Sequence, residues 1–509
     1  MMSNEWKQRA RARATTVVTE HGGLMALLLL VAYWSVSMLH RGHSWGDDFT
    51  LYLRQSKSLV DGNVGQVIAD NHFNVDNAAK PGFSPYVYPW GWPMLLAPFV
   101  RLFGLNYLRL KLVEVACLLG FLWGFHQVVR QRLPKWAALG VVAVIGTSLA
   151  YVRHTDQLLS ELPYMAAVAA TLWYLDRLRR NGPLDHATRN QLIVLGLLAM
   201  AVFNVRREGL AMIAAIGVAQ LFDLRGRRRT ANWRRLATPF VAFAGSVILL
   251  QLMLPSALAP EYENSGLHQT WKKLMGPFRG SFAGQLGFEH LRGTGLLLVF
   301  LVVMAGVVVR MWKATAQDAP LLVFAVGSLV IVGMIPANAT RYTMAITPFA
   351  VYFAAQAFAA IPFPKALPVK QAGAWLATAV LAAVTLVHLT DLPSTVSAEQ
   401  RRNDAGYVAD GPDQPYAQAA FTAVRTYTHE VDVVAFFKAR ALTFFTNRRA
   451  VQSSDLSILR QRADYFMMRR GSTSSQPLVD DATAAAMGWV AVWQDDDWVL
   501  WRLPLYEAG

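Results

Sequence analysis

Acidic and basic side chains follow several of the apolar runs in this chain, and together they could bind a phosphate and accept a proton. The carboxylates Asp47 and Asp48 come directly after the first apolar run, and Glu161 lies in a turn between two later runs. A carboxylate can act as a general base. Arg206 and Arg207 follow another run, and guanidinium groups bind phosphate through a planar fork of N–H donors. This combination predicts transfer of a group from a phosphate leaving group to a hydroxyl.

Further polar residues fall on the same side of the apolar runs. We expect Arg341 and Lys80 to help hold the phosphate. Ionisable groups at membrane depth are costly unless they are buried in protein or line a wet cavity. Six further polar residues on this side of the apolar runs are therefore predicted to line the substrate cavity. These residues are Tyr86, Tyr88, His154, Asp156, Glu208 and Tyr342.

Each charged residue also has a structural alternative. Asp47 could cap the helix that follows it, and Glu161 could complement a helix dipole. Arg206 and Arg207 could extend from a helix end toward water. Neighbouring helical residues do not share a face. We therefore assign Asp47 to the cavity as the candidate base, and Asp48 to pairing or capping.

A metal ion is the remaining possibility for the acidic residues. His154 and Asp156, with Asp47 or Asp48, could bind a divalent cation. However, no ligand spacing here predicts a metal site. The sequence thus predicts no resident cofactor, and the expected bound molecules are substrates.

The composition indicates where these residues act. Of the 509 residues, 54% are apolar and 16% are charged, and the mean hydropathy is +0.28. A soluble globular protein carries roughly 25% charged residues, so the chain is expected in a membrane. High hydrophobicity excludes intrinsic disorder, and a single cysteine, Cys117, excludes a disulfide scaffold.

Apolar runs that approach the length of a membrane span recur up to residue 391. A helix of about 20 apolar residues crosses the hydrocarbon core of a bilayer. About eleven such helices are predicted, at 22–40, 107–129, 136–153, 157–177, 190–206, 208–223, 236–257, 293–312, 319–336, 341–361 and 371–391. The first is expected to be an uncleaved span, because residues 37–41 offer no small-x-small cleavage site.

The net charge of +15 is explained by topology and gives no reason to expect nucleic acid as a partner. Basic clusters beside membrane spans mark the cytoplasmic side. With a cytoplasmic N-terminus, one side receives Arg130, Arg132, Lys135, Arg177, Arg179, Arg180, Arg189, the arginines between 225 and 235, Arg310, Lys313, Lys365 and Lys370. We expect a multi-pass protein of the bacterial inner membrane, with its C-terminal segment in the periplasm.

Three segments are predicted on the extracytoplasmic side, at 41–106, at 258–292 and from 392 onward. The first should carry helices at 49–60 and 92–103 that lie along the membrane surface. The last has a helix at 415–429 and strands at 431–437, 463–468, 489–494 and 498–503, the final two forming a hairpin. The predicted fold is a polytopic α-helical membrane module, 1–391, followed by a soluble α/β domain, 392–509.

The motif WGDDFTLYL at 45–53 resembles the acidic pair that opens the first extracytoplasmic loop of GT-C glycosyltransferases. These include the protein O-mannosyltransferases and the lipid A aminoarabinose transferases. Similar stretches follow in the family order: YPWGWP at 88–93, LFG at 102–104, SELP at 160–163, RREGL at 206–210, and RY at 341–342 with Pro348. Asp48 and Arg207 stand where many members have Glu and Pro. The resemblance covers about 40–360 and implies a sugar transferase that uses a polyprenyl-phosphate-linked monosaccharide, with Asp47 as the base.

The expected activity is therefore glycosyl transfer to a hydroxyl of a lipid, glycan or protein on the extracytoplasmic face, with inversion at the anomeric carbon. Two alternatives remain. A transporter or flippase of lipid-linked or anionic sugars would use the same charges for binding alone, and a polymerase or ligase would transfer whole glycans. Transporters often contain internal repeats and midplane charges. This sequence has no visible repeat and places its charges at one face, which favours the enzyme.

Overall fold

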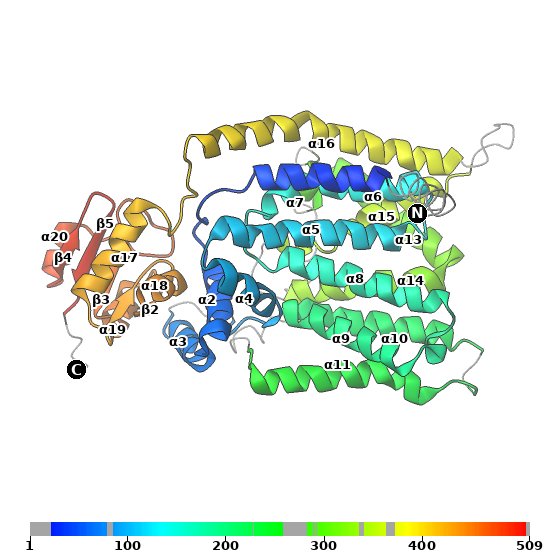
Figure 1. Cartoon of the computed structure of the whole chain (residues 1–509). Coiled ribbons are helices and arrows are strands. Elements are labelled where there is room, and N and C mark those ends of the chain that lie inside the picture. Colours follow the sequence, from blue (N-terminus) through cyan, green and yellow to red (C-terminus); the bar gives the residue numbers. More distant parts are fainter. Residues whose placement is uncertain are drawn as a thin grey trace, which may run out of the picture.

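Helices make up most of the chain in the computed structural model, which describes residues 22–78, 85–226, 229–257, 282–288, 291, 293–334, 340–362 and 372–504. Figure 1 shows a bundle of helices that run side by side, with a small sheet domain beyond one end of the bundle. Helices α2 Asp47–Asp61, α3 Val64–Asp76 and α4 Gly91–Phe103 lie between the bundle and the sheet domain (Figure 1). Most of the predicted loop 258–292 falls outside the described residues.

The bundle contains all the helices that overlap the predicted spans. Their bounds are Gly22–Ser37, α5 Tyr107–Val129, α6 Lys135–Thr147, α7 Leu149–His154, α8 Glu161–Arg180, α9 Arg189–Val205, α10 Ala211–Asp223, α11 Trp233–Met253, α13 Thr294–Lys313, α14 Thr315–Met334, α15 Thr347–Ala359 and α16 Ala372–Asp404. Short 3-10 helices occur at η1 Leu184–His186, η2 Arg207–Leu210 and η4 Thr340–Thr343.

The prediction of a mainly helical membrane protein with a small sheet domain is confirmed. Within the described residues, five helices are long and apolar enough to cross a membrane: α5, α11, α13, α14 and α16. The third predicted span, 136–153, is divided between α6 and α7. The break falls at Ser148, whose ψ of 126° is extended, and an apolar run carries no signal for such a break.

Glycines allow some bundle helices to approach each other closely. A Cβ on Gly306 of α13 would lie 1.8 Å from the carbonyl oxygen of Phe353 in α15. A Cβ on Gly196 of α9 would lie 2.4 Å from the carbonyl oxygen of Pro239 in α11. Small residues at such contacts are typical of membrane helix pairs, whose backbones meet without a side chain between them.

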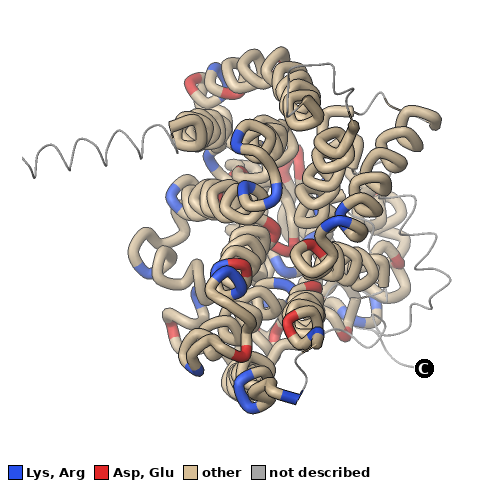
Figure 2. Tube along the Cα trace, turned by 90° about the vertical axis from the view of Figure 1, so that its right-hand side faces the viewer, with Lys and Arg blue, Asp and Glu red and all other residues tan. Residues whose placement is uncertain are grey.

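A buried ion-pair cluster joins helices at the bundle end opposite the sheet domain. Arg132, which follows α5, pairs with Asp176 of α8 at 2.5 and 2.8 Å and with Asp318 of α14 at 2.8 Å. Tyr352 of α15 donates to Asp318 at 2.9 Å. Figure 2 views this end and shows basic and acidic positions among the helix ends. Arg132 therefore has a structural role, because it links α5 to α8 and α14.

The helices between the bundle and the sheet domain are α2 Asp47–Asp61, α3 Val64–Asp76 and α4 Gly91–Phe103. Helices α2 and α4 were predicted, at 49–60 and 92–103, and α3 was not. The buried face of α3 contains Asn71 and Asn74 beside Val67 and Val75. It therefore lacks the continuous apolar stripe from which a helix is predicted.

The sheet domain contains five strands in the order β2-β1-β3-β5-β4. Their bounds are β1 Val433–Ala435, β2 Arg449–Val451, β3 Tyr465–Arg469, β4 Val490–Gln494 and β5 Trp498–Arg502, and the helices are α17 Pro415–Tyr427, α18 Ala439–Thr446, α19 Leu456–Arg462 and α20 Asp481–Ala486. Strand β1 is parallel to β2 and β3, and β5 is antiparallel to β3 and β4. The predicted hairpin is confirmed as β4 and β5, whereas the three-residue strand β2 was missed.

Helix α16 passes the predicted domain boundary at 391 and ends at Asp404. The sheet domain consequently begins after that residue, because the end of an apolar run marks only a change in polarity and a helix can continue into water. The polar part of α16 binds the segment after the first helix. Glu399 contacts His40 at 3.1 Å, and Asn403 donates to the carbonyl of Leu39 at 3.0 Å.

Candidate functional site

The acidic pair occupies the first turn of α2, between the bundle and the sheet domain. Gly46 is the N-cap, and Asp47 and Asp48 are the first two helical residues. Gly46, which has no side chain, therefore occupies the capping position, and Asp47 is not the N-cap. The two carboxylates still benefit from the positive end of the helix dipole, and both are available to other partners.

Asp48 is bound by two donors from distant parts of the chain. The hydroxyl of Tyr88, which precedes α4, donates to Oδ1 of Asp48 at 2.6 Å. Nη2 of Arg341, in η4, forms an ion pair with Oδ2 of Asp48. These contacts bring together residues from three of the stretches that resemble the glycosyltransferase family.

Glu161 extends this network to two arginines. Its Oε1 lies 2.8 Å from Nη1 of Arg206 and 3.5 Å from Nε of Arg341, and its Oε2 lies 3.4 Å from Nε2 of His154. Arg206 also pairs with Glu208 at 2.8 Å. The structure thus joins Asp48, Arg341, Glu161, Arg206, Glu208 and His154 through ion pairs and one hydrogen-bond contact, and we call this set the charge network.

Aromatic rings enclose the charge network. The ring centroid of Tyr342 lies 5.1 Å from the guanidinium of Arg206 and 5.3 Å from that of Arg341. Tyr52, one helical turn after Asp48, stacks on Tyr88 with ring centroids 4.4 Å apart. Its hydroxyl donates to Oγ of Ser160 at 2.9 Å. Rings near cations favour them through the π-face.

Asp47 faces a different partner, on the sheet domain. Its Oδ2 lies 3.2 Å from Nζ of Lys438, which precedes α18. Among the described residues, its Oδ1 is buried and has no hydrogen-bond partner. A buried carboxylate oxygen without a donor is costly and marks a position where a ligand hydroxyl could be accommodated.

The two carboxyl groups are perturbed in opposite directions. Burial raises the pKa of Asp47, although the charges of Lys438 and Arg440 oppose that effect. Burial acts in the same direction on Asp48. There, the charge of Arg341 and the hydrogen bonds from Tyr88 and Arg341 outweigh it and hold the pKa of Asp48 below its usual value. Such divergence is expected where one carboxyl exchanges protons and the other remains ionised.

Several predicted site residues lie away from the charge network. Asp156 binds Nζ of Lys111 at 2.7 Å and the backbone N–H of His40 at 2.8 Å. It therefore fastens the end of the first helix instead of joining His154. Tyr86 stacks on His72 with centroids 4.1 Å apart and donates to Asp76. Both placements correct the expectation that these two residues line one cavity with Tyr88.

Arg207 also departs from its expected position. Its guanidinium lies 4.4 Å from the ring centroid of Phe203, and Nη2 donates to Oγ of Ser256. The preceding residue, Arg206, has an extended backbone with φ −148° and ψ 139°. Successive side chains in extended backbone point to opposite sides, so one arginine enters the network and its neighbour leaves it. Lys80 lies outside the described residues.

Some residues at the site and in its surroundings carried a sequence signal on which no prediction was based. Tyr52 is four positions after Asp48, the spacing that shares a helical face. Lys111 and Glu114 are ionisable residues inside a predicted span, and both are fully buried. Ionisable residues at membrane depth are candidate functional residues, but the prediction applied this criterion only to residues beside the spans. Lys438 and Arg440 carried no such signal, since only tertiary folding brings them to the site.

The cationic groups nearest Asp47 and Asp48 could hold an anion. The side chain of Arg341 is 26% exposed and that of Lys438 is 23% exposed, whereas Arg206 is 12% exposed and already lies between two glutamates. Arg341 and Lys438 are thus the more accessible of the three. The described residues contain no group of three His, Cys, Asp or Glu side chains placed to hold a metal ion.

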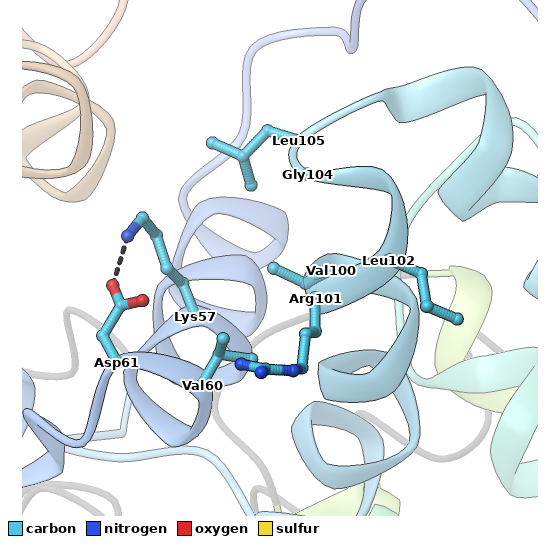
Figure 3. Close-up of a pocket in the computed structure, with 8 residues that line it drawn as sticks. All are labelled: Lys57, Val60, Asp61, Val100, Arg101, Leu102, Gly104 and Leu105. Carbon is cyan, nitrogen blue, oxygen red and sulfur yellow. Dashed lines mark hydrogen bonds and ion pairs between the residues drawn. The ribbon is translucent and has the colours of Figure 1, made fainter.

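An open pocket of about 430 Å³ lies nearby, between the C-terminal halves of α2 and α4. Figure 3 shows its lining, which comprises Lys57, Val60, Asp61, Val100, Arg101, Leu102, Gly104 and Leu105. Lys57 is paired with Asp61 across one helical turn. None of the predicted site residues lines this pocket, so it is separate from the charge network.

No family model and no curated protein matches the sequence. Solved structures do match the fold. ArnT from Cupriavidus metallidurans bound to undecaprenyl phosphate aligns with a TM-score of 0.52 and 14% identity, over 94% of this chain and 98% of that one. The oligosaccharyltransferase AglB from Archaeoglobus fulgidus, in complex with an inhibitory peptide and a dolichol-phosphate, aligns with a TM-score of 0.52 and 10% identity, over 89% and 70% of the chains. The chain therefore shares its fold with ArnT and with AglB, in agreement with the fold that the resemblance of the sequence motifs predicted.

Proposed function

We propose that this chain is a glycosyltransferase that moves a monosaccharide from a polyprenyl-phosphate-linked donor to a hydroxyl of a lipid, glycan or protein. The observation that carries the proposal is the buried, uncommitted oxygen of Asp47, which lies beside a carboxylate that pairs with Arg341. A proton acceptor next to a cation is what transfer from a phosphate leaving group requires. The shared fold of ArnT and AglB, bound to lipid phosphates in their structures, supports a lipid-linked donor.

In the proposed reaction, the acceptor oxygen attacks the anomeric carbon while Oδ1 of Asp47 takes the acceptor proton. The bond between the anomeric carbon and the phosphate oxygen breaks, and its electron pair leaves with the polyprenyl phosphate. Arg341 and Arg206 stabilise the charge that develops on that phosphate. Direct displacement inverts the anomeric configuration. Asp48 and Glu161 position the arginines, and no metal is needed to balance the step.

The topology belongs to the same proposal. About eleven membrane spans place the N-terminus in the cytoplasm of a bacterial inner membrane, and the sheet domain in the periplasm beside the site. Helices α2 and α4 lie along the membrane surface. The apolar side chains of Leu102, Leu95 and Met94 on α4 are exposed, as expected for a helix face in contact with lipid.

The activity is tested with purified protein in liposomes that contain a panel of polyprenyl-phosphate sugars and a lipid extract as acceptor. We expect release of polyprenyl phosphate by the wild type and at least a hundredfold lower turnover by Asp47→Asn. Asp61→Asn is the matched control, since Asp61 lies on the same helix and pairs with Lys57 at the surface. Full turnover by Asp47→Asn would contradict the assignment of the base.

A second candidate is the transfer of whole glycans, which the shared fold of the oligosaccharyltransferase AglB favours. The same liposomes, supplied with a lipid-linked oligosaccharide, distinguish the two activities. Consumption of the oligosaccharide with no consumption of monosaccharide donors would replace the first proposal. Movement of a lipid-linked sugar across the bilayer without its consumption would identify a flippase.

A further inference from the structure

Lys438 is the charged residue through which the sheet domain reaches Asp47. It lies between β1 and α18 and forms the N-cap position of α18. Its Nζ is 3.2 Å from Oδ2 of Asp47, and the two side chains are 23% and 11% exposed. The pair is thus largely shielded from solvent. An ion pair in such a position interacts more strongly than one at the surface.

Aromatic packing just before each partner in the sequence holds this ion pair in place. Trp45, two residues before Asp47, lies with its ring centroid 5.0 Å from that of Phe437, the residue before Lys438. Nε1 of Trp45 also donates to the hydroxyl of Tyr416 at 3.0 Å. The chain that leads into α2 is therefore seated in the core of the sheet domain, and the two charged residues cannot drift apart independently.

A second anchor follows Lys438. Arg440 is buried, and it donates from Nε to Oδ1 of Asn71 in α3 at 2.8 Å and from Nη2 to the carbonyl of Pro85 at 2.8 Å. Lys438 is consequently held between two contacts with the segment that carries the acidic pair. Its position is determined on both sides, as expected of a residue that must place its charge accurately.

We propose that Lys438 is a positioning residue for Asp47, supplied by the sheet domain. By binding Oδ2 it leaves Oδ1 as the oxygen that receives the acceptor proton, and its charge keeps the carboxyl ionised between turnovers. The inference rests on the proposed function, in which Asp47 is the base. It implies that the bundle and the segment 41–106 alone form an incomplete site.

The electrostatic surroundings of Asp47 agree with this role. The charged groups around it are Lys438, Arg440 and Asp48. Burial raises the pKa of Asp47, Lys438 and Arg440 lower it, and Asp48 raises it further. Without Lys438 the remaining balance shifts toward the protonated carboxylic acid, which cannot accept a proton.

Labelling of the full chain with a hydrophobic carbodiimide tests the inference without requiring a donor. The reagent reacts with protonated carboxyl groups, and mass spectrometry of the peptide that contains Asp47, with Asp47→Asn as the blank, gives the pH of half-labelling. We expect Lys438→Gln and Lys438→Met to raise that pH by about one unit. Lys438→Arg should restore it, and Arg460→Gln, at an exposed position of α19, should leave it unchanged.

Turnover is then measured with the donor that the wild type consumes. In Lys438→Gln and Lys438→Met it should fall by a larger factor near pH 6 than near pH 8.5, because a raised pKa leaves more of Asp47 protonated at the lower pH, and Lys438→Arg should recover the wild-type profile. If folded Lys438→Gln and Lys438→Met are half-labelled at the same pH as the wild type, the proposed role of Lys438 is wrong. It is also wrong if these variants lose turnover by the same factor at both pH values. A labelling shift in a protein that consumes no donor would instead refute the proposed function and leave the link between Lys438 and Asp47 intact.

Discussion

The hydroxyl of Tyr88 donates to Oδ1 of Asp48 at 2.6 Å, and so connects the segment before α4 to the first turn of α2. The same carboxylate pairs through its other oxygen with Arg341. Both oxygens of Asp48 are therefore committed to donors, whereas Asp47 retains one that is not. This difference separates the roles of two adjacent aspartates, because only the uncommitted oxygen is ready to receive a proton.

Tyr88→Phe should lower turnover by roughly tenfold or more, because a hydrogen bond to a charged group contributes about 1.5–3 kcal/mol. Its loss would free Asp48 to turn away from Arg341. Tyr86→Phe is the matched control, since the hydroxyl of Tyr86 donates to Asp76 instead. Equal turnover in the two variants, measured as release of polyprenyl phosphate, would show that the contact with Asp48 is dispensable.

The adjacent arginines should respond differently to the same substitution. Arg206→Lys is expected to lower the free energy of unfolding by about 2 kcal/mol and to weaken the binding of undecaprenyl phosphate. The reason is that one ammonium group cannot replace a guanidinium that lies between Glu161 and Glu208. Arg207→Lys should have little effect on binding, since that side chain lies on Phe203. Calorimetric unfolding and lipid binding check both statements, and a larger binding loss for Arg207→Lys would reverse the assignment.

Asp413 should make stability depend on mildly acidic pH. Burial raises the pKa of Asp413 to about 6, against the opposing backbone N–H of His43 and the charge of Lys111. In the unfolded chain it ionises near its ordinary pKa of about 4. Below pH 4 it is neutral in both states, and between about pH 4 and pH 6 the unfolded chain ionises first, so the folded state loses stability as pH rises.

Asp413→Asn cannot ionise and should escape this loss. Relative to the wild type it should gain more than tenfold in the folding equilibrium between about pH 4 and pH 6, with no further gain above pH 6. Asp496→Asn, at an exposed turn, provides the comparison. A stability difference between wild type and Asp413→Asn that does not change across this window would be inconsistent with a raised pKa.

Gly411→Ala should detach the sheet domain from the segment before α2. A Cβ at this position would lie 1.7 Å from the carbonyl oxygen of His43, so one of the two backbones must move. We expect a loss of roughly 2 kcal/mol or more and faster hydrogen exchange around Trp45. Gly65→Ala, in α3 with no atom within 4 Å of the added Cβ, should be neutral or slightly stabilising.

Much of the bundle follows from the lengths of apolar runs. Predicted spans such as 107–129 and 190–206 match α5 and α9 within a residue, since apolar sequence of that length has few other stable arrangements in a membrane. The sequence could not reveal the break at Ser148, which depends on one residue's backbone. Nor could it reveal β2, a strand of three residues whose pairing is supplied by its neighbour β1.

The site was predicted in part, for a physical reason. Residue types identified Asp48, Glu161, Arg206 and Arg341, because charges beside apolar runs are rare and must find partners. The sequence could not distinguish Arg206 from Arg207, since that difference depends on one extended residue. Lys438 lies in an ordinary polar stretch of the sheet domain, and its proximity to Asp47 depends entirely on how that domain docks.

The unbroken course of α16 has a consequence for how the two ends of the protein move. Its 33 residues span about 50 Å at 1.5 Å each, and no flexible linker separates the apolar half from the half that binds His40 and Leu39. One inserted residue would rotate everything beyond it by roughly 100° about the helix axis. A tilt of α16 in the bilayer would therefore displace His40 and Leu39, which its polar half binds, and with them the segment that leads into α2.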